Sequence, residues 1–87
     1  MYNVSIKKKV LKKLNKLPVW VQKKMAILAL DLRDTGPEQP NWQNFSQLSS
    51  MKYHCHLGTS WAACWEHDSN TINIEVYYVG SREKAPY

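Results

Sequence analysis

The spacing of apolar residues changes from a period of two to a helical period near the start of the chain. Residues 2–6 alternate enough to predict a short strand. From Ile6 onward, apolar residues recur at helical spacing, and lysines occupy the opposite face. The residues of this apolar stripe are Ile6, Val10, Leu14 and Leu17. A strand that leads into an amphipathic helix is therefore expected.

A second helix is predicted over residues 18–35. Pro18 ends the first helix and can begin the next, because proline is tolerated in a first helical turn. Gly36 and Pro37 form a strong stop signal. The expected buried stripe consists of Val21, Met25, Leu28 and Leu32. Since only a proline turn separates the two helices, they should pack as an antiparallel hairpin.

The rest of the chain predicts a loop followed by three strands. The loop, residues 37–51, is rich in Pro, Asn, Gln and Ser. Its anchors to the core are expected to be Trp42, Phe45 and Leu48. The strands are expected at about 52–58, 61–67 and 71–80, with turn-forming residues between them. The inward-facing residues of the last strand should be Ile72, Ile74 and Val76.

This order of elements predicts one α+β domain over residues 1–87. The helical hairpin would pack on one face of a small, mainly antiparallel four-stranded sheet. The other face would stay open, and an open concave face with polar groups is a reasonable place for function.

Charge is concentrated at one end of this domain. The chain has a net charge of +5, and residues 1–24 contain eight lysines and no acidic residue. These are Lys7, Lys8, Lys9, Lys12, Lys13, Lys16, Lys23 and Lys24. Such a basic end suggests a polyanion or an acidic partner. The alternative is an ordinary solvated helix face.

Composition excludes several classes of protein. Two cysteines are too few for a disulfide scaffold. No apolar run approaches the ~20 residues of a membrane span, and the N-terminal residues lack the apolar core of a signal peptide. We therefore expect a cytoplasmic protein with reduced thiols and no membrane contact.

Residues 53–57, YHCHL, carry the most reactive side chains of the predicted sheet. Strand alternation turns the apolar residues towards the helices and leaves His54 and His56 on the open side. A hairpin that turns at 58–60 would pair residue 54 with 64 and residue 56 with 62, which brings Cys64 and Glu66 to the same face.

One interpretation of this cluster is a metal site with His54, His56 and Cys64 as ligands. The chain has no CxxC or HxxxH pair and no clear fourth ligand, so no metal is expected. The other simple interpretation is structural, because histidine on a half-exposed strand and a small buried cysteine are both common.

The tail adds two groups that suit RNA cleavage. Arg82 can hold a phosphate bidentately, and an exposed Tyr87 can stack on a nucleobase. Two histidines can remove the 2′-hydroxyl proton and protonate the leaving 5′-oxygen near neutral pH, without a metal or other cofactor.

Three stretches, LPVWVQKK, YHCHLGTSWAACWEH and YYVGSREKAPY, fit one family in this order. With these stretches and its element order, the chain resembles the RelE/ParE superfamily of bacterial toxins over essentially its whole length. The last stretch is the most specific, because it is similar to the family's final strand, glycine, basic residue and C-terminal tyrosine.

The resemblance implies a ribosome-dependent endoribonuclease that cuts mRNA and is neutralised by a cognate antitoxin. His54 and His56 fall on the family's catalytic basic positions. Arg82 falls on its phosphate-binding arginine, and Tyr87 on its base-stacking tyrosine. The eight lysines above, together with Lys84, would contact RNA, and DNA would be met only through the antitoxin complex.

Two departures and two alternatives accompany this resemblance. RelE itself has lysines where this chain has its paired histidines, and a further arginine where it has Ala62, which removes one phosphate contact. The alternatives are a gyrase-inhibiting toxin of the ParE branch and a catalytically degenerate RNA- or metal-binding module of the same fold.

Overall fold

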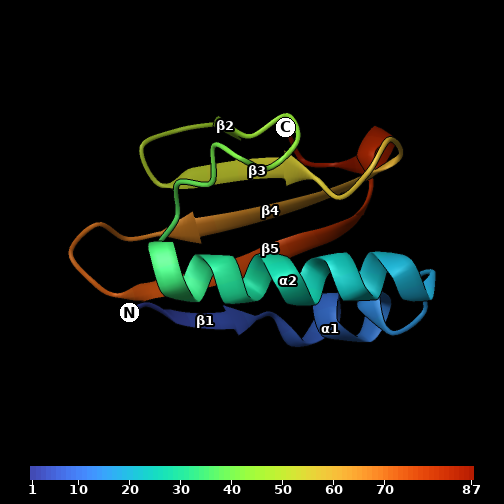
Figure 1. The fold of residues 1–87 in the computed structure, drawn as a ribbon, viewed down its shortest axis with the longest axis horizontal. Helices are drawn as coiled ribbons and strands as arrows, with labels where there is room; N and C mark the ends of the chain where they lie inside the picture. Colours follow the sequence, from blue (N-terminus) through green and yellow to red (C-terminus); the bar gives the residue numbers. More distant parts are fainter.

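Five strands form one mixed sheet, and two helices cover one of its faces (Figure 1). The computed structural model describes residues 1–87. The elements are β1 (Asn3–Ile6), α1 (Lys8–Leu14), α2 (Val19–Thr35), β2 (Ser46–Gln47), β3 (Lys52–His56), β4 (Trp61–His67), β5 (Asn73–Ser81) and the 3-10 turn η1 (Arg82–Lys84). Across the sheet the order is β1-β5-β4-β3-β2, in which β1 runs parallel to β5 and the other pairs are antiparallel. The α+β class is confirmed, but the sheet has five strands rather than the expected four.

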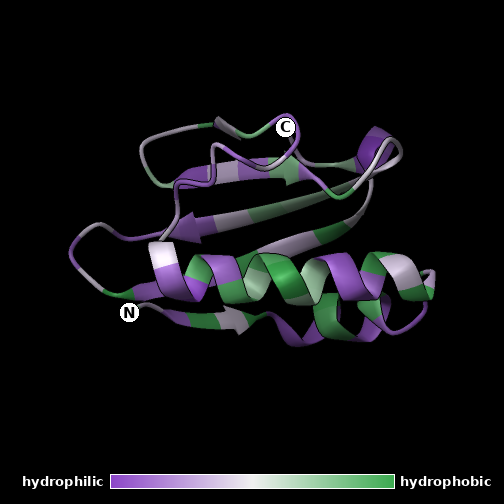
Figure 2. Cartoon of the chain, in the orientation of Figure 1, coloured by the Kyte–Doolittle hydropathy of each residue, from purple (hydrophilic) through white to green (hydrophobic).

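The core lies between the helices and the inner face of the sheet. All four residues of the stripe expected in α2 are buried in it, as are Val10 and Leu14 of α1. The sheet contributes Tyr53, Cys55, Leu57, Ala63, Trp65, Ile74, Val76 and Val79. Burial of one large apolar side chain stabilises the fold by about 1.5–3 kcal/mol, so this layer holds the helices on the sheet. Figure 2 shows apolar and polar residues interleaved along α2, and neither helix is long and apolar enough to cross a membrane.

Several element boundaries differ from the expectation, and two of these differences change where an apolar side chain lies. The first helix begins at Lys8 instead of Ile6, because Ile6 belongs to β1 and pairs with Val76. Strand β5 begins at Asn73, so Ile72 lies outside it and is 60% exposed rather than inward-facing.

An irregular pairing of β4 with β5 decides which tyrosines face away from the core. Trp65 pairs with Val76, but Cys64 pairs with Tyr78, so Tyr77 is an extra residue in β5. Val79 then returns to the core. Tyr78 consequently lies on the same strand face as Cys64, at the side of the sheet that α1 borders.

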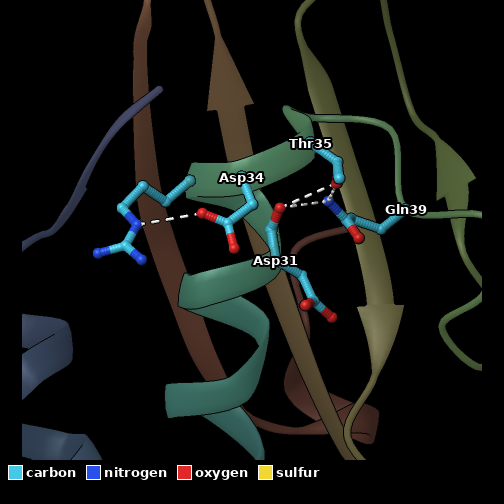
Figure 3. A network of polar contacts seen from close by, with 5 residues as sticks. Asp31, Asp34, Thr35 and Gln39 are labelled. Carbon is cyan, nitrogen blue, oxygen red and sulfur yellow. Dashed lines mark hydrogen bonds and ion pairs between the residues drawn. The ribbon is translucent and has the colours of Figure 1, made fainter. Parts of the chain in front are cut away.

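A polar network at the end of α2 fixes the path of the loop that follows (Figure 3). The Gln39 side-chain amide donates to the Asp31 carbonyl at 3.1 Å, the Gly36 carbonyl at 2.8 Å and the Thr35 hydroxyl at 2.8 Å. Trp42 Nε1 donates to Asp31 Oδ2 at 2.8 Å. These bonds hold residues 36–42 against the helix.

The anchored loop contains the strand that the sequence did not predict. Ser46 and Gln47 form β2 and pair with His54 and Tyr53. Of the expected anchors, Trp42 and Phe45 pack against the core, whereas Leu48 is half-buried outside it. The loop therefore closes the sheet at its β3 edge.

We predict that Gly36→Ala lowers the free energy of unfolding by about 1–3 kcal/mol. Gly36 has a φ of 94°, and an added Cβ would lie 2.8 Å from the Tyr2 ring. Urea denaturation followed by tryptophan fluorescence measures the change. The control Asp34→Ala, exposed at the same helix end, should change stability by less than about 0.5 kcal/mol. Wild-type stability in Gly36→Ala would contradict the strain argument.

Candidate active site

Strand β3 places two imidazoles on the face of the sheet opposite the helices. The three apolar residues of YHCHL belong to the core, and His54 and His56 alternate with them. Across β4, His54 pairs with Cys64 and His56 pairs with Ala62. The expected register and the expected face of both histidines are therefore confirmed.

The face is not open at this point, in contrast to the expectation. His54 is 8% exposed and His56 is 7% exposed. The tail returns over β3, so that the Tyr87 ring lies 4.2 Å from the His54 ring, centroid to centroid. The Tyr87 hydroxyl is 3.4 Å from His56 Nε2, which is a long hydrogen bond. Tyr87 is itself half exposed and acts as the cover of the pair.

Ser46 fixes the orientation of the His54 ring. Its Oγ lies 2.9 Å from His54 Nδ1. Because Nδ1 is engaged, Nε2 is the nitrogen left for proton transfer. This contact could not be predicted from the sequence, because a two-residue strand inside a polar loop shows no period.

His56 also contributes to a surface hollow in which Tyr87 takes no part. It lines a hollow of about 360 Å³ together with Lys24, Asn41 and Gln43. The Gln43 carbonyl also accepts a hydrogen bond from the His56 backbone N–H at 2.8 Å. Lys24, expected among the RNA-binding lysines, thus lies on the approach to one of the two imidazoles.

Both histidines have lowered pKa values. Burial is the main cause for His54, the charge of His56 acts in the same direction, and a hydrogen bond to the Ser46 backbone partly opposes them. Burial also comes first in lowering the pKa of His56, followed by the charge of Arg82. Both rings are therefore mainly neutral at pH 7, and a neutral imidazole can accept a proton.

Arg82 lies at the start of η1 with an exposed side chain. Its backbone N–H donates to the Ser60 carbonyl at 2.9 Å, which ties the tail to the turn between β3 and β4. Across the sheet His56 pairs with Ala62, and Ala62 pairs with Gly80; neither of these two partners carries a charge. Arg82 is the charged residue that acts on His56 from this end of the face.

The cysteines are unsuited to metal binding or nucleophilic attack. Burial raises the pKa of Cys55 and of Cys64 to about 12, so both thiols are protonated at neutral pH. Cys64 does lie beside His54, but no group of three or more His, Cys, Asp or Glu side chains is placed so as to hold a metal ion.

Comparison with known proteins identifies the fold through structure alone. No family model matches the chain, and no curated protein is significantly similar to it in sequence. The RelE of an archaeal RelE–RelB complex from Pyrococcus horikoshii superimposes with a TM-score of 0.77 at 18% identity, over 97% of this chain and 98% of that one. The isolated E. coli RelE toxin gives 0.75 at 15%, over 99% and 89%. The chain has the RelE fold.

Other structures with this fold include a YoeB–YefM complex from Staphylococcus aureus. It has a TM-score of 0.70 at 12% identity and covers 94% of this chain and 98% of that chain. Sequence identities this low show similarity of the backbone fold only, so the chemistry of the site depends on this chain's own residues.

On the RelE fold of this chain, the nine expected RNA-binding lysines lie in different places. Five of them surround Tyr78: Lys7, Lys9, Lys13, Lys16 and Lys84. Lys24 lies near His56. The other three, Lys8, Lys12 and Lys23, are exposed and line none of these hollows.

NMR titration of the two imidazoles should give midpoints below the ordinary 6.5. Because folding lowers these pKa values, the unfolded chain binds more protons below about pH 6.5, and stability should decrease as the pH falls from there. Tyr87→Ala should move both midpoints towards 6.5 by uncovering the rings. Tyr87→Phe keeps the ring and should change His54 little. Wild-type midpoints at or above 6.5 would contradict the burial argument.

Proposed function

We propose that the chain is the toxin of a toxin–antitoxin pair and cleaves ribosome-bound mRNA. The observation that carries this is the pair of neutral, oriented imidazoles, His54 and His56, on the outer face of a RelE-fold sheet. The charge of Arg82 acts on one of them and the ring of Tyr87 covers both. Together they supply a base, an acid, a cation and an aromatic ring.

The proposed reaction needs only these side chains. One neutral imidazole removes the 2′-hydroxyl proton, and the 2′-oxygen attacks the adjacent phosphorus. The bond from phosphorus to the 5′-oxygen breaks, and the other imidazole gives a proton to that oxygen in the minor fraction of molecules in which this second ring is protonated. Arg82 stabilises the charge on the crowded phosphate. His54 is suited to the role of base, because Ser46 leaves its Nε2 free.

The tail has to move for this reaction to occur. In the closed arrangement Tyr87 occupies the place above His54 where a nucleotide would lie. Displacing the ring would uncover both imidazoles and free the ring to stack on a base, which is worth about 1–3 kcal/mol. Tyr87 would then serve as cover in the free protein and as an orienting residue in the complex.

The proposed partners are the ribosome and a cognate antitoxin, which places the activity in the cytoplasm. Two of the structures above were solved as toxin complexes, RelE with RelB and YoeB with YefM. In this chain the outermost strand β1 has a free edge beside an apolar hollow of about 510 Å³. Val4, Ala29 and the exposed Leu30 line that hollow, which offers an antitoxin both backbone and apolar contacts.

His54→Ala and His56→Ala should each slow cleavage of ribosome-bound mRNA by about 10²–10⁴-fold. Arg82→Ala should slow this cleavage roughly 10²-fold, and Arg82→Lys should restore part of the lost rate. Primer extension on mRNA from a translation reaction measures the cuts.

His67→Gln is the matched control, because His67 lies at the other end of β4 and bonds the Thr71 carbonyl. It should cut like wild type. Equal cutting by all variants would remove the assignment, and DNA damage with intact mRNA would favour the gyrase-inhibiting alternative.

A further inference from the structure

Two adjacent hollows surround Tyr78 on the side of the molecule where α1 meets β5. One has a volume of about 310 Å³ and the other about 320 Å³. Both are lined by Lys13, Tyr78 and Val79, so they form one groove that is divided by the tyrosine. We call this the Tyr78 groove.

All charged side chains that line the Tyr78 groove are positive. Five lysines line it, and no aspartate or glutamate does. The hollow at the opposite end of β5, of about 430 Å³, is lined by Glu66, Asp68 and Glu75. Only Lys7 has a carboxylate within ion-pair distance, Glu75 at 3.9 Å. The groove therefore favours a polyanion.

The ring of Tyr78 is held in a fixed position inside this groove. Its hydroxyl donates to the Ser81 carbonyl at 2.6 Å. A Cβ at position 80 would come within 3.0 Å of that hydroxyl and 3.2 Å of the ring, so Gly80 leaves the space that the ring fills. A preorganised, partly exposed aromatic ring among lysines is an arrangement that proteins use to hold single-stranded nucleic acid.

The groove leads to the candidate active site. Tyr78 pairs with Cys64, which pairs with His54, so the three residues form one row across the sheet. At the spacing of neighbouring strands, Tyr78 lies about 10 Å from His54. Pro86, which directly precedes Tyr87, lines the groove, and so does Lys84, three positions before Tyr87.

We propose that the Tyr78 groove binds the single-stranded RNA that continues from the scissile phosphate. The lysines contact successive phosphates, and one base stacks on Tyr78. This inference rests on the proposed function and adds to it the path of the substrate.

Binding can be tested apart from cleavage with a fluorescent ten-nucleotide RNA whose 2′-hydroxyls are all methylated. Such an RNA lacks the attacking group and stays intact. Anisotropy titrations at several salt concentrations give the affinity and the number of phosphate contacts.

Lys13→Ala should weaken binding and reduce the salt slope by about one, because Lys13 lines both hollows. Arg33→Ala, which removes an exposed helical cation outside the groove, should change neither. Tyr78→Leu should weaken binding roughly 5-fold to 150-fold, and Tyr78→Phe, which keeps the ring but loses the bond to Ser81, should lose much less affinity than Tyr78→Leu. Thermal unfolding of each variant shows that the fold is kept.

Equal losses of RNA affinity in Lys13→Ala and Arg33→Ala would contradict the proposed groove, because binding would then be a diffuse charge effect. Undetectable wild-type binding would overturn it as well. Stronger binding of a polyglutamate peptide, with the same dependence on Lys13 and Tyr78, would replace RNA by an acidic protein segment.

The two proposals fail separately. If the groove variants lose RNA binding while His54→Ala still cuts mRNA, the assigned chemistry is wrong and the groove stands. If His54→Ala stops cutting while every groove variant binds normally, only the groove is wrong.

Discussion

The two-residue period of strand β3 couples the core of this protein to its candidate chemistry. Residues 53–57, in this strand and directly after it, supply three side chains to the layer under the helices and two imidazoles to the opposite face. A one-residue slip of β3 would bury both histidines among apolar side chains and expose the core residues, at a cost of several kcal/mol. Packing against α2 therefore fixes which way His54 and His56 point.

The environment of the imidazoles depends on segments far away in the sequence. The network around Gln39 holds the loop after α2, and this loop delivers Ser46 to His54 and Gln43 to His56. From the other end of the chain, Tyr87 closes over both rings. Burial then keeps the rings neutral at pH 7, so the chemistry of the pair is set by a loop and a tail rather than by the strand itself.

Features with a repeating pattern could be predicted from the sequence. The buried stripe of α2, the faces of β3 and the pairing of His54 with Cys64 all follow from periodicity and one turn position. Three features could not be predicted, because each depends on tertiary contact. Strand β2 is too short to show alternation, the bulge in β5 resets the period at Tyr77, and the closure by Tyr87 arises from a non-periodic tail. The roles of Arg82 and Tyr87 came from resemblance and chemistry, and they remain predictions.

Replacement of a single nucleotide at a mapped cleavage position by its 2′-deoxy form tests the central claim most directly. The proposed reaction requires a 2′-hydroxyl whose proton passes to an imidazole, so wild-type protein should leave that position uncut while cutting an unmodified site in the same ribosome-bound message. Cleavage of the deoxy position at an undiminished rate would show that the 2′-oxygen is not the nucleophile and would contradict the roles given to His54 and His56.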